Sequence, residues 1–138
     1  MKKLKFGLVS GIIGTITSVI ASVIAYFVVI AVLIAMAFSE MDSVVITFME
    51  ILMYINIFSN VVAIIGLCLY FKKPKAAAVV LTLAVIFNIA VYCYLIYLGG
   101  FSNTILFIVS MIPALLIIIS TIPAYKYKNT TPNNNYFN

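Results

Sequence analysis

Four polar residues in otherwise apolar runs are the first candidates for chemistry in this chain: Asn56, Asn60, Asn88 and Ser110. An amide or hydroxyl surrounded by hydrocarbon needs a hydrogen-bond partner, because leaving it unpaired there is costly. The partner is either a polar group on another segment or a bound solute or ion. We expect Asn60 and Asn88 to meet and to bond two segments together, with Asn56 one helical turn away on the same face as Asn60. A midplane solute or ion site is the alternative.

Glu50 is the one carboxylate inside an apolar run, since Glu40 and Asp42 belong to a short polar turn. If the apolar runs cross a bilayer, Glu50 is the residue that a proton-coupled transporter would use. However, it lies about 21 residues before Phe71, or roughly 31 Å along a helix, against a hydrocarbon thickness of ~30 Å. We therefore expect this carboxylate near the outer headgroups and in water. A carboxylate that faces a cavity is the alternative.

The residue types that carry most enzyme chemistry are missing or badly placed. The chain contains no His, and Cys68 and Cys93 lie in apolar runs with no base beside them. It has no phosphate-binding loop and no pair of carboxylates within an apolar run. The sequence therefore predicts a protein that is not an enzyme and that binds no cofactor or metal ion.

The composition indicates an integral membrane protein. Hydrophobic residues make up 66% of the 138 residues and charged residues only 8%, which excludes an ordinary soluble domain. The net charge of +5 is not arranged as a basic helix face, so it does not indicate nucleic-acid binding. We attribute the charge to contact with anionic lipid headgroups, which makes the lipid bilayer the first partner.

The basic residues predict the membrane topology. All eight are lysines, in three short clusters: Lys2, Lys3 and Lys5; Lys72, Lys73 and Lys75; Lys126 and Lys128. Lysine is costly at the centre of a bilayer, and lysine-rich loops stay on the cytoplasmic side. Three clusters on one side require an even number of crossings between neighbouring clusters. We therefore expect four spans with both termini in the cytoplasm.

The expected fold is all-α, an integral membrane four-helix bundle made of two antiparallel transmembrane hairpins within residues 1–128. The spans are predicted at about 7–38, 44–71, 76–98 and 104–124. The first two are longer than a bilayer requires, so we expect them to project together on the outer side. Residues 129–138 are rich in Asn and Thr, and we expect them to form a disordered cytoplasmic tail.

The first span carries a stripe of small residues at spacings of three and four: Gly7, Gly11, Gly14, Ser18, Ser22 and Ala25. Small residues let transmembrane helices approach closely, so this face is expected to pack on a neighbour. We favour packing within the bundle, with a dimer interface as the alternative. In the fourth span, Pro113 removes one backbone hydrogen bond, and we expect a kink there.

The whole pattern resembles a group of small four-span bacterial membrane proteins that are classed as domains of unknown function and come mostly from Gram-positive organisms. The resemblance rests on the lysine-rich start, the glycine-rich first span, the last span with Pro113, and residues 66–78, GLCLYFKKPKAAA. It implies a four-span fold and no assigned activity. The use of Lys without Arg, beside abundant Ile and Asn, also points to an AT-rich bacterial genome.

We therefore expect a non-enzymatic, multi-pass protein in the cytoplasmic (plasma) membrane of a Gram-positive bacterium. It would act through protein–protein contacts as an accessory, stress-related or immunity-type protein, with another membrane protein or a second copy as its partner. The alternative is a small oligomeric transporter or channel that uses the midplane polar site or Glu50.

Overall fold

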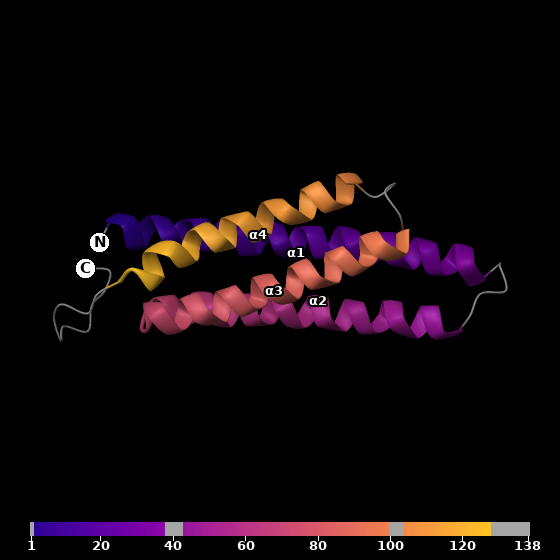
Figure 1. Ribbon diagram of the computed structural model, residues 1–138, viewed down its shortest axis with the longest axis horizontal. Helices are drawn as coiled ribbons and strands as arrows, with labels where there is room; N and C mark the ends of the chain where they lie inside the picture. The colour runs from indigo at the N-terminus through magenta and orange to yellow at the C-terminus, as the bar shows by residue number, and fades with distance from the viewer. Residues whose placement is uncertain (1, 38–42, 100–103, 128–138) are drawn as a thin grey trace.

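The computed structural model describes residues 2–37, 43–99 and 104–127, and this part of the chain is helical apart from short turns (Figure 1). Its helices are α1 (Lys2–Ala37), α2 (Ser43–Tyr70), α3 (Pro74–Gly99) and α4 (Thr104–Tyr125). The prediction of an all-α chain is thereby confirmed for the described residues. Residues 39–42 of the predicted outer turn, with Glu40 and Asp42, and the predicted tail at 129–138 lie outside them.

A tight turn joins α2 to α3, and its sequence explains its form. The amides of Lys72 and Lys73 donate to the carbonyl of Leu69 at 3.0 and 2.7 Å, which completes the last turn of α2. Pro74 then begins α3. At the first position of a helix the backbone amide makes no hydrogen bond within the helix, so the missing amide proton of proline costs nothing there. The amide of Ala77 donates to the carbonyl of Lys73 at 3.0 Å. The end of α2 is therefore held beside the start of α3.

The helices run roughly along one direction and form two close pairs (Figure 1). α1 lies against α4, α2 lies against α3, and α3 also packs extensively on α4. α1 and α2 contact each other much less. At the end away from the termini, α1 and α2 extend beyond α3 and α4.

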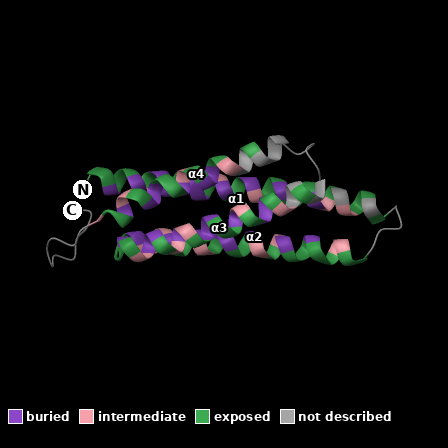
Figure 2. Ribbon diagram, in the orientation of Figure 1, coloured by how far each residue is buried: buried purple, intermediate pink, exposed green. Residues whose placement is uncertain are grey.

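The described helices expose hydrocarbon along their length. Three stretches are long and apolar enough to cross a membrane, namely Lys2–Ala35, Ser43–Tyr70 and Pro74–Tyr94, and α4 adds a shorter apolar stretch, Met111–Tyr125. Figure 2 shows exposed residues along the outer sides of the helices, and many of them are large hydrophobic side chains. So much uncovered apolar surface is typical of a protein that is surrounded by lipid.

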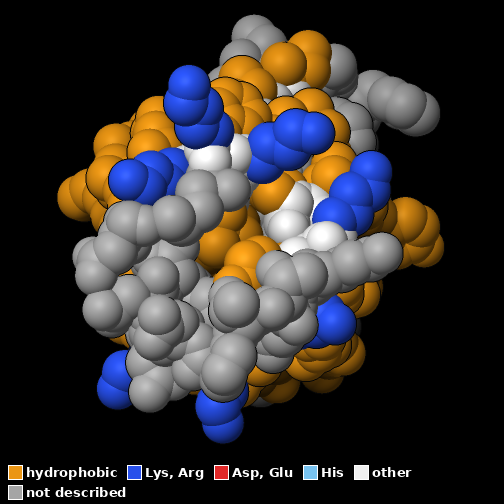
Figure 3. Space-filling view, turned by 90° about the vertical axis from the view of Figure 1, so that its left-hand side faces the viewer, with side chains coloured by type: hydrophobic (Ala, Val, Ile, Leu, Met, Phe, Trp, Pro, Cys, Tyr) orange, Lys and Arg blue, Asp and Glu red, His pale blue; other side chains and the backbone are white. Residues whose placement is uncertain are grey.

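The described lysines gather at one end of the molecule (Figure 3). They come from the start of α1, from the turn between α2 and α3, and from the end of α4, and all of them are exposed: Lys2, Lys3, Lys5, Lys72, Lys73, Lys75 and Lys126. Residues far apart in the sequence therefore meet at one charged end, while the helix surfaces beyond it are apolar.

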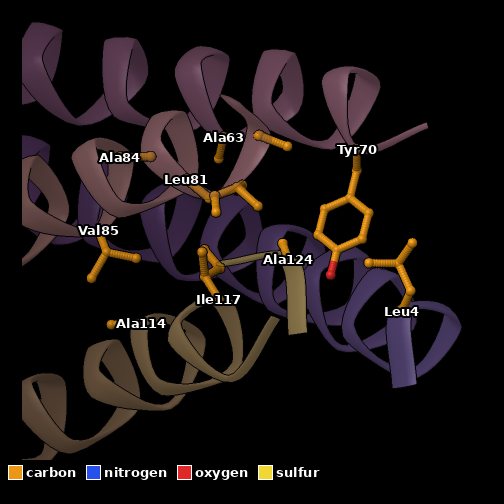
Figure 4. Packing of buried hydrophobic residues seen from close by; sticks show 11 residues of the cluster. Leu4, Ala63, Tyr70, Leu81, Ala84, Val85, Ala114, Ile117 and Ala124 are labelled. Carbon is orange, nitrogen blue, oxygen red and sulfur yellow. The ribbon is translucent and has the colours of Figure 1, made fainter. Parts of the chain in front are cut away.

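The buried hydrophobic cluster consists largely of alanines, which let the helices approach closely (Figure 4). Tyr70 is its largest member. The ring of Tyr70 reaches from α2 toward Leu4 on α1 and Ala124 on α4, and none of its surface is exposed. Its hydroxyl donates to the carbonyl of Ser120 on α4 at 2.8 Å. This one side chain thus joins three helices near the lysine-rich end.

Candidate functional site

A series of hydrogen bonds joins five polar side chains from α1, α2 and α3. Asn88 donates through Nδ2 to Ser18 Oγ at 3.1 Å, and Ser18 donates to Asn60 Oδ1 at 2.8 Å. Asn60 then donates through Nδ2 to Ser22 Oγ at 2.8 Å, and Ser22 donates to Asn56 Oδ1 at 2.6 Å. We call these five residues the polar network. Their bonds share one direction, so each polarises the next and strengthens it.

The antiparallel register of α1 and α2 produces this network. Ser18 lies opposite Asn60, and Ser22 lies opposite Asn56, one helical turn further along both helices. Asn88 approaches from α3 and bonds to Ser18, which links a third helix to the pair. Four of the five residues are buried and Ser22 is half-buried. Most of their polar groups therefore bond to one another inside the bundle.

The sequence selects three members of the network, Asn56, Asn60 and Asn88, and the structure brings all three together. Asn60 and Asn88 are linked through the hydroxyl of Ser18. Spacing alone assigns Ser18 and Ser22 only to a packing face, and their hydrogen bonding is missed. The sequence does contain a signal for these hydrogen bonds, because Ser18 and Ser22 are four residues apart and the two asparagines of α2 have the same spacing. Ser110, the fourth residue selected, belongs to α4, but its side chain lies outside the described part of the chain.

The stripe of small residues on α1 faces the other three helices. Gly7, Gly11 and Gly14 lie against α4, and Gly7 and Gly11 also face Tyr70 and Leu67 of α2. A Cβ on Gly14 would come within 2.9 Å of Leu116 Cβ and 3.0 Å of the backbone N of Ile117. No larger residue fits there unless the helices move apart. Ser18 and Ser22, in contrast, bond to α2 and α3. Ala25 is buried and borders the groove between α1 and α2.

Further hydroxyl groups tie the helices to neighbouring backbones. Ser10 Oγ on α1 donates to the carbonyl of Leu116 on α4 at 2.8 Å. Ser59 Oγ on α2 donates to the carbonyl of Ala84 on α3 at 2.7 Å. Sequence reasoning misses both bonds, because an isolated serine in an apolar helix does not identify the carbonyl that it will meet.

A groove of about 380 Å³ lies between α1 and α2, beside the polar network. It is lined by residues between positions 19 and 29 of α1 and between 52 and 64 of α2, together with Val91 of α3. Several lining side chains, such as Val23 and Ile57, are about half exposed, so the groove opens to the side of the bundle. Most of its wall is hydrocarbon, and Ser22, Asn56 and Asn60 supply polar groups. The groove exists because α1 and α2 make few direct contacts.

Two other predicted residues lie apart from this site. Glu50 is exposed on α2 and is not among the residues that line the groove, which begin on this helix at Leu52. Pro113 is buried inside α4, and the helix continues through it to Tyr125. A bend at Pro113 stays a prediction.

The chemistry that the described residues offer is uncharged hydrogen bonding. Among them, no three His, Cys, Asp or Glu side chains are grouped so that they could hold a metal ion. Comparisons of the chain with protein-family models, curated proteins and solved structures found no match. The function proposed below therefore rests on the polar network, the groove and the arrangement of the helices.

Proposed function

We propose that this is an integral protein of the bacterial cytoplasmic membrane, with four spans and both termini in the cytoplasm. The exposed apolar surface supports insertion, and the shared lysine-rich end supports the orientation. α4, with 22 residues, is roughly 33 Å long, which is enough to cross a hydrocarbon core of ~30 Å. A Gram-positive source and kinship with the uncharacterised four-span family belong to the same proposal and rest on the sequence pattern.

A reporter fused after Asn138 tests the orientation directly. An enzyme that is active only in the cytoplasm should be active in this fusion, and one that is active only outside the membrane should be silent. The opposite pair of results would place the lysine-rich end outside and refute the topology.

Within the membrane, the protein acts through contacts with another membrane protein, as an accessory, stress-related or immunity-type factor without catalytic activity. The observation that carries this proposal is the projection of α1 and α2 beyond α3 and α4 (Figure 1). α1 has 36 residues and α2 has 28, or roughly 54 and 42 Å, so both exceed the hydrocarbon core. Ile34 and Val44 lie near the projecting ends and are well exposed. Apolar side chains that no neighbouring helix covers are suited to a protein partner.

Site-specific photocrosslinking in living cells tests this contact. A photoreactive residue at Ile34 or at Val44 should give the same protein adduct, because both positions belong to the projecting ends. The matched control is Ile86 on the exposed side of α3, which should not give that adduct. Equal adducts from all three positions would contradict the proposal, and an adduct with twice the mass of the chain would show that the partner is a second copy.

The polar network is the observation that favours transport as a second function. Its side chains, however, are bonded to one another, and the groove beside it is mostly hydrocarbon. A solute would have to replace these internal bonds. We therefore expect purified protein in liposomes to show no flux that depends on the network. Flux that Asn60→Leu or Glu50→Gln abolishes without unfolding the protein would establish the transporter instead.

A further inference from the structure

Asn56 carries a hydrogen-bond donor that the polar network leaves unused. Its Oδ1 accepts from Ser22 Oγ at 2.6 Å and from Asn60 Nδ2 at 3.2 Å. Its own Nδ2, in contrast, donates to no acceptor among the described residues. The side chain is only 6% exposed, and it lines the groove between α1 and α2. Because an amide N–H without an acceptor is costly where no water reaches it, Asn56 favours an acceptor that enters the groove.

The size of the groove favours a slender occupant. At roughly 30 Å³ for a water-sized group, about 380 Å³ holds on the order of a dozen non-hydrogen atoms. A helix is about 10 Å across with its side chains, so it is too wide to enter. An alkyl chain of about ten carbons with one oxygen matches the volume. A small lipid-soluble molecule therefore fills this volume, whereas a transmembrane helix could place only single side chains in it.

The surroundings of Asn56 favour an occupant without charge. None of the side chains that line the groove is Lys, Arg, Asp or Glu. Asn56 lies about 16 residues before Lys72, or roughly 24 Å along the helix, which is within a hydrocarbon core of ~30 Å measured from the lysine-rich end. An ion without a partner is strongly disfavoured at that depth. A neutral oxygen that accepts one hydrogen bond is the group that this position suits.

We propose that the groove between α1 and α2 is a binding site for an uncharged lipid-soluble molecule, a slender alkyl chain with a carbonyl or ether oxygen that accepts a hydrogen bond from Asn56 Nδ2. The proposal needs insertion into the membrane, but it does not need the protein partner proposed above. Acyl chains of the surrounding lipid can fill the groove, but their methylene groups leave Asn56 without an acceptor. The oxygen of the ligand is therefore what makes binding selective.

The probe for this site is a decanone that carries an alkyl diazirine, added to the full chain in phospholipid nanodiscs. After illumination, the labelled residues are identified by mass spectrometry. We expect labels on the groove residues of α1 and α2. In competition, 2-decanone should displace the label about three- to tenfold more effectively than decane, which corresponds to one neutral hydrogen bond.

Matched variants separate the groove from the rest of the surface. Val61 lines the groove and Val79 on α3 does not, although they are 48% and 49% exposed. Val61→Phe should reduce labelling several-fold, whereas Val79→Phe should leave it unchanged. Asn56→Leu should keep the labelling but remove the advantage of 2-decanone over decane. This variant should fold, because Ser22 can still donate to the carbonyl of Ser18 at 2.8 Å.

Three results would overturn the proposal. The first is labelling of the exposed side of α3 as strongly as the groove, which would show simple partition into lipid. The second is equal competition by decane and 2-decanone in the unmodified protein. The third is a dimer that Val61→Phe dissociates, with no label in the groove, which would show that a second copy occupies it. Failure of the crosslinks at Ile34 and Val44 would not affect any of these three results. The proposed ligand site and the proposed protein partner can therefore be refuted separately.

Discussion

α1 meets α4 and α2 in different ways. On one side Gly7, Gly11 and Gly14 lie against α4, where a Cβ on each would come within 2.5, 3.2 and 2.9 Å of atoms of Pro123, Ser120 and Leu116. Tyr70 and Leu67 of α2 also approach Gly7 and Gly11. We call this α1–α4 contact the closed seam. On the other side Ser18 and Ser22 hold two asparagines of α2 by hydrogen bonds, and a groove of about 380 Å³ remains beside them. We call this α1–α2 contact the open seam.

The difference shows that small residues can serve two purposes on one helix. Glycine removes the side chain, so two helices approach until their backbones are nearly in contact. A serine opposite an asparagine bridges a wider separation, because the bond is made between the ends of two side chains. In lipid, no hydrophobic driving force closes the remaining space. The open seam is therefore held mainly by hydrogen bonds between side chains. The closed seam is held mainly by close packing, with one hydrogen bond from Ser10 to the carbonyl of Leu116.

Gly14→Leu should cause the largest loss of stability, because it puts four carbons where even one meets Leu116 and Ile117. We expect the free energy of unfolding in detergent to fall by about 3 kcal/mol, the upper part of the usual range for overpacking. The control is Ala31→Leu on the exposed side of the same helix, which should have little effect. Equal stability of the two variants would mean that the seam is not closed.

Asn60→Leu should cause the next largest loss, because Asn60 is the middle of the network that holds the open seam. It removes the bonds to Ser18 and Ser22, and we expect a loss of about 2 kcal/mol in the free energy of unfolding. The control is Thr47→Val on the same helix, since the exposed Thr47 hydroxyl bonds only to the backbone of its own helix. An unchanged stability for Asn60→Leu would show that the network does not hold α1 to α2.

The features that sequence predicts here are those that depend on local chemistry. The turn after Tyr70 follows from Pro74, which has no amide proton to donate within a helix. The grouping of Asn60 with Asn88, which the structure links through Ser18, follows from the cost of an unpaired amide in hydrocarbon.

The features that sequence does not predict depend on how far apart whole helices lie. Ser18 and Ser22 bond to asparagines only because the antiparallel register places them opposite one another. The groove depends on the separation of α1 from α2, which results from the packing of all the helices together. A stripe of small residues shows that a face packs closely, but it does not show that several neighbouring helices share the stripe.

Tyr70→Phe tests the hydrogen bond that joins α2 to α4 beside the closed seam. The change removes the bond from the Tyr70 hydroxyl to the carbonyl of Ser120 and keeps the buried ring. We expect a loss of about 1 kcal/mol, which is typical of one hydrogen bond. Tyr54→Phe is the matched control, because Tyr54 is 73% exposed and should contribute almost nothing. If both variants were equally stable, burial of the ring alone would hold α2 at this end.

Val61→Phe should have the smallest effect, and it gives the sharpest test of the contrast between the seams. Both Val61→Phe and Gly14→Leu add several carbons beside α1, so only the space available differs. Val61 lines the groove and is about half exposed, and the larger ring can enter empty volume without moving a helix. We therefore expect a change of less than about 0.5 kcal/mol in the free energy of unfolding, measured in the same detergent. A loss as large as that of Gly14→Leu would mean that α1 and α2 close on each other in the folded protein. In that case the unused donor of Asn56 would face a neighbouring helix, and a ligand would have no space in which to reach it.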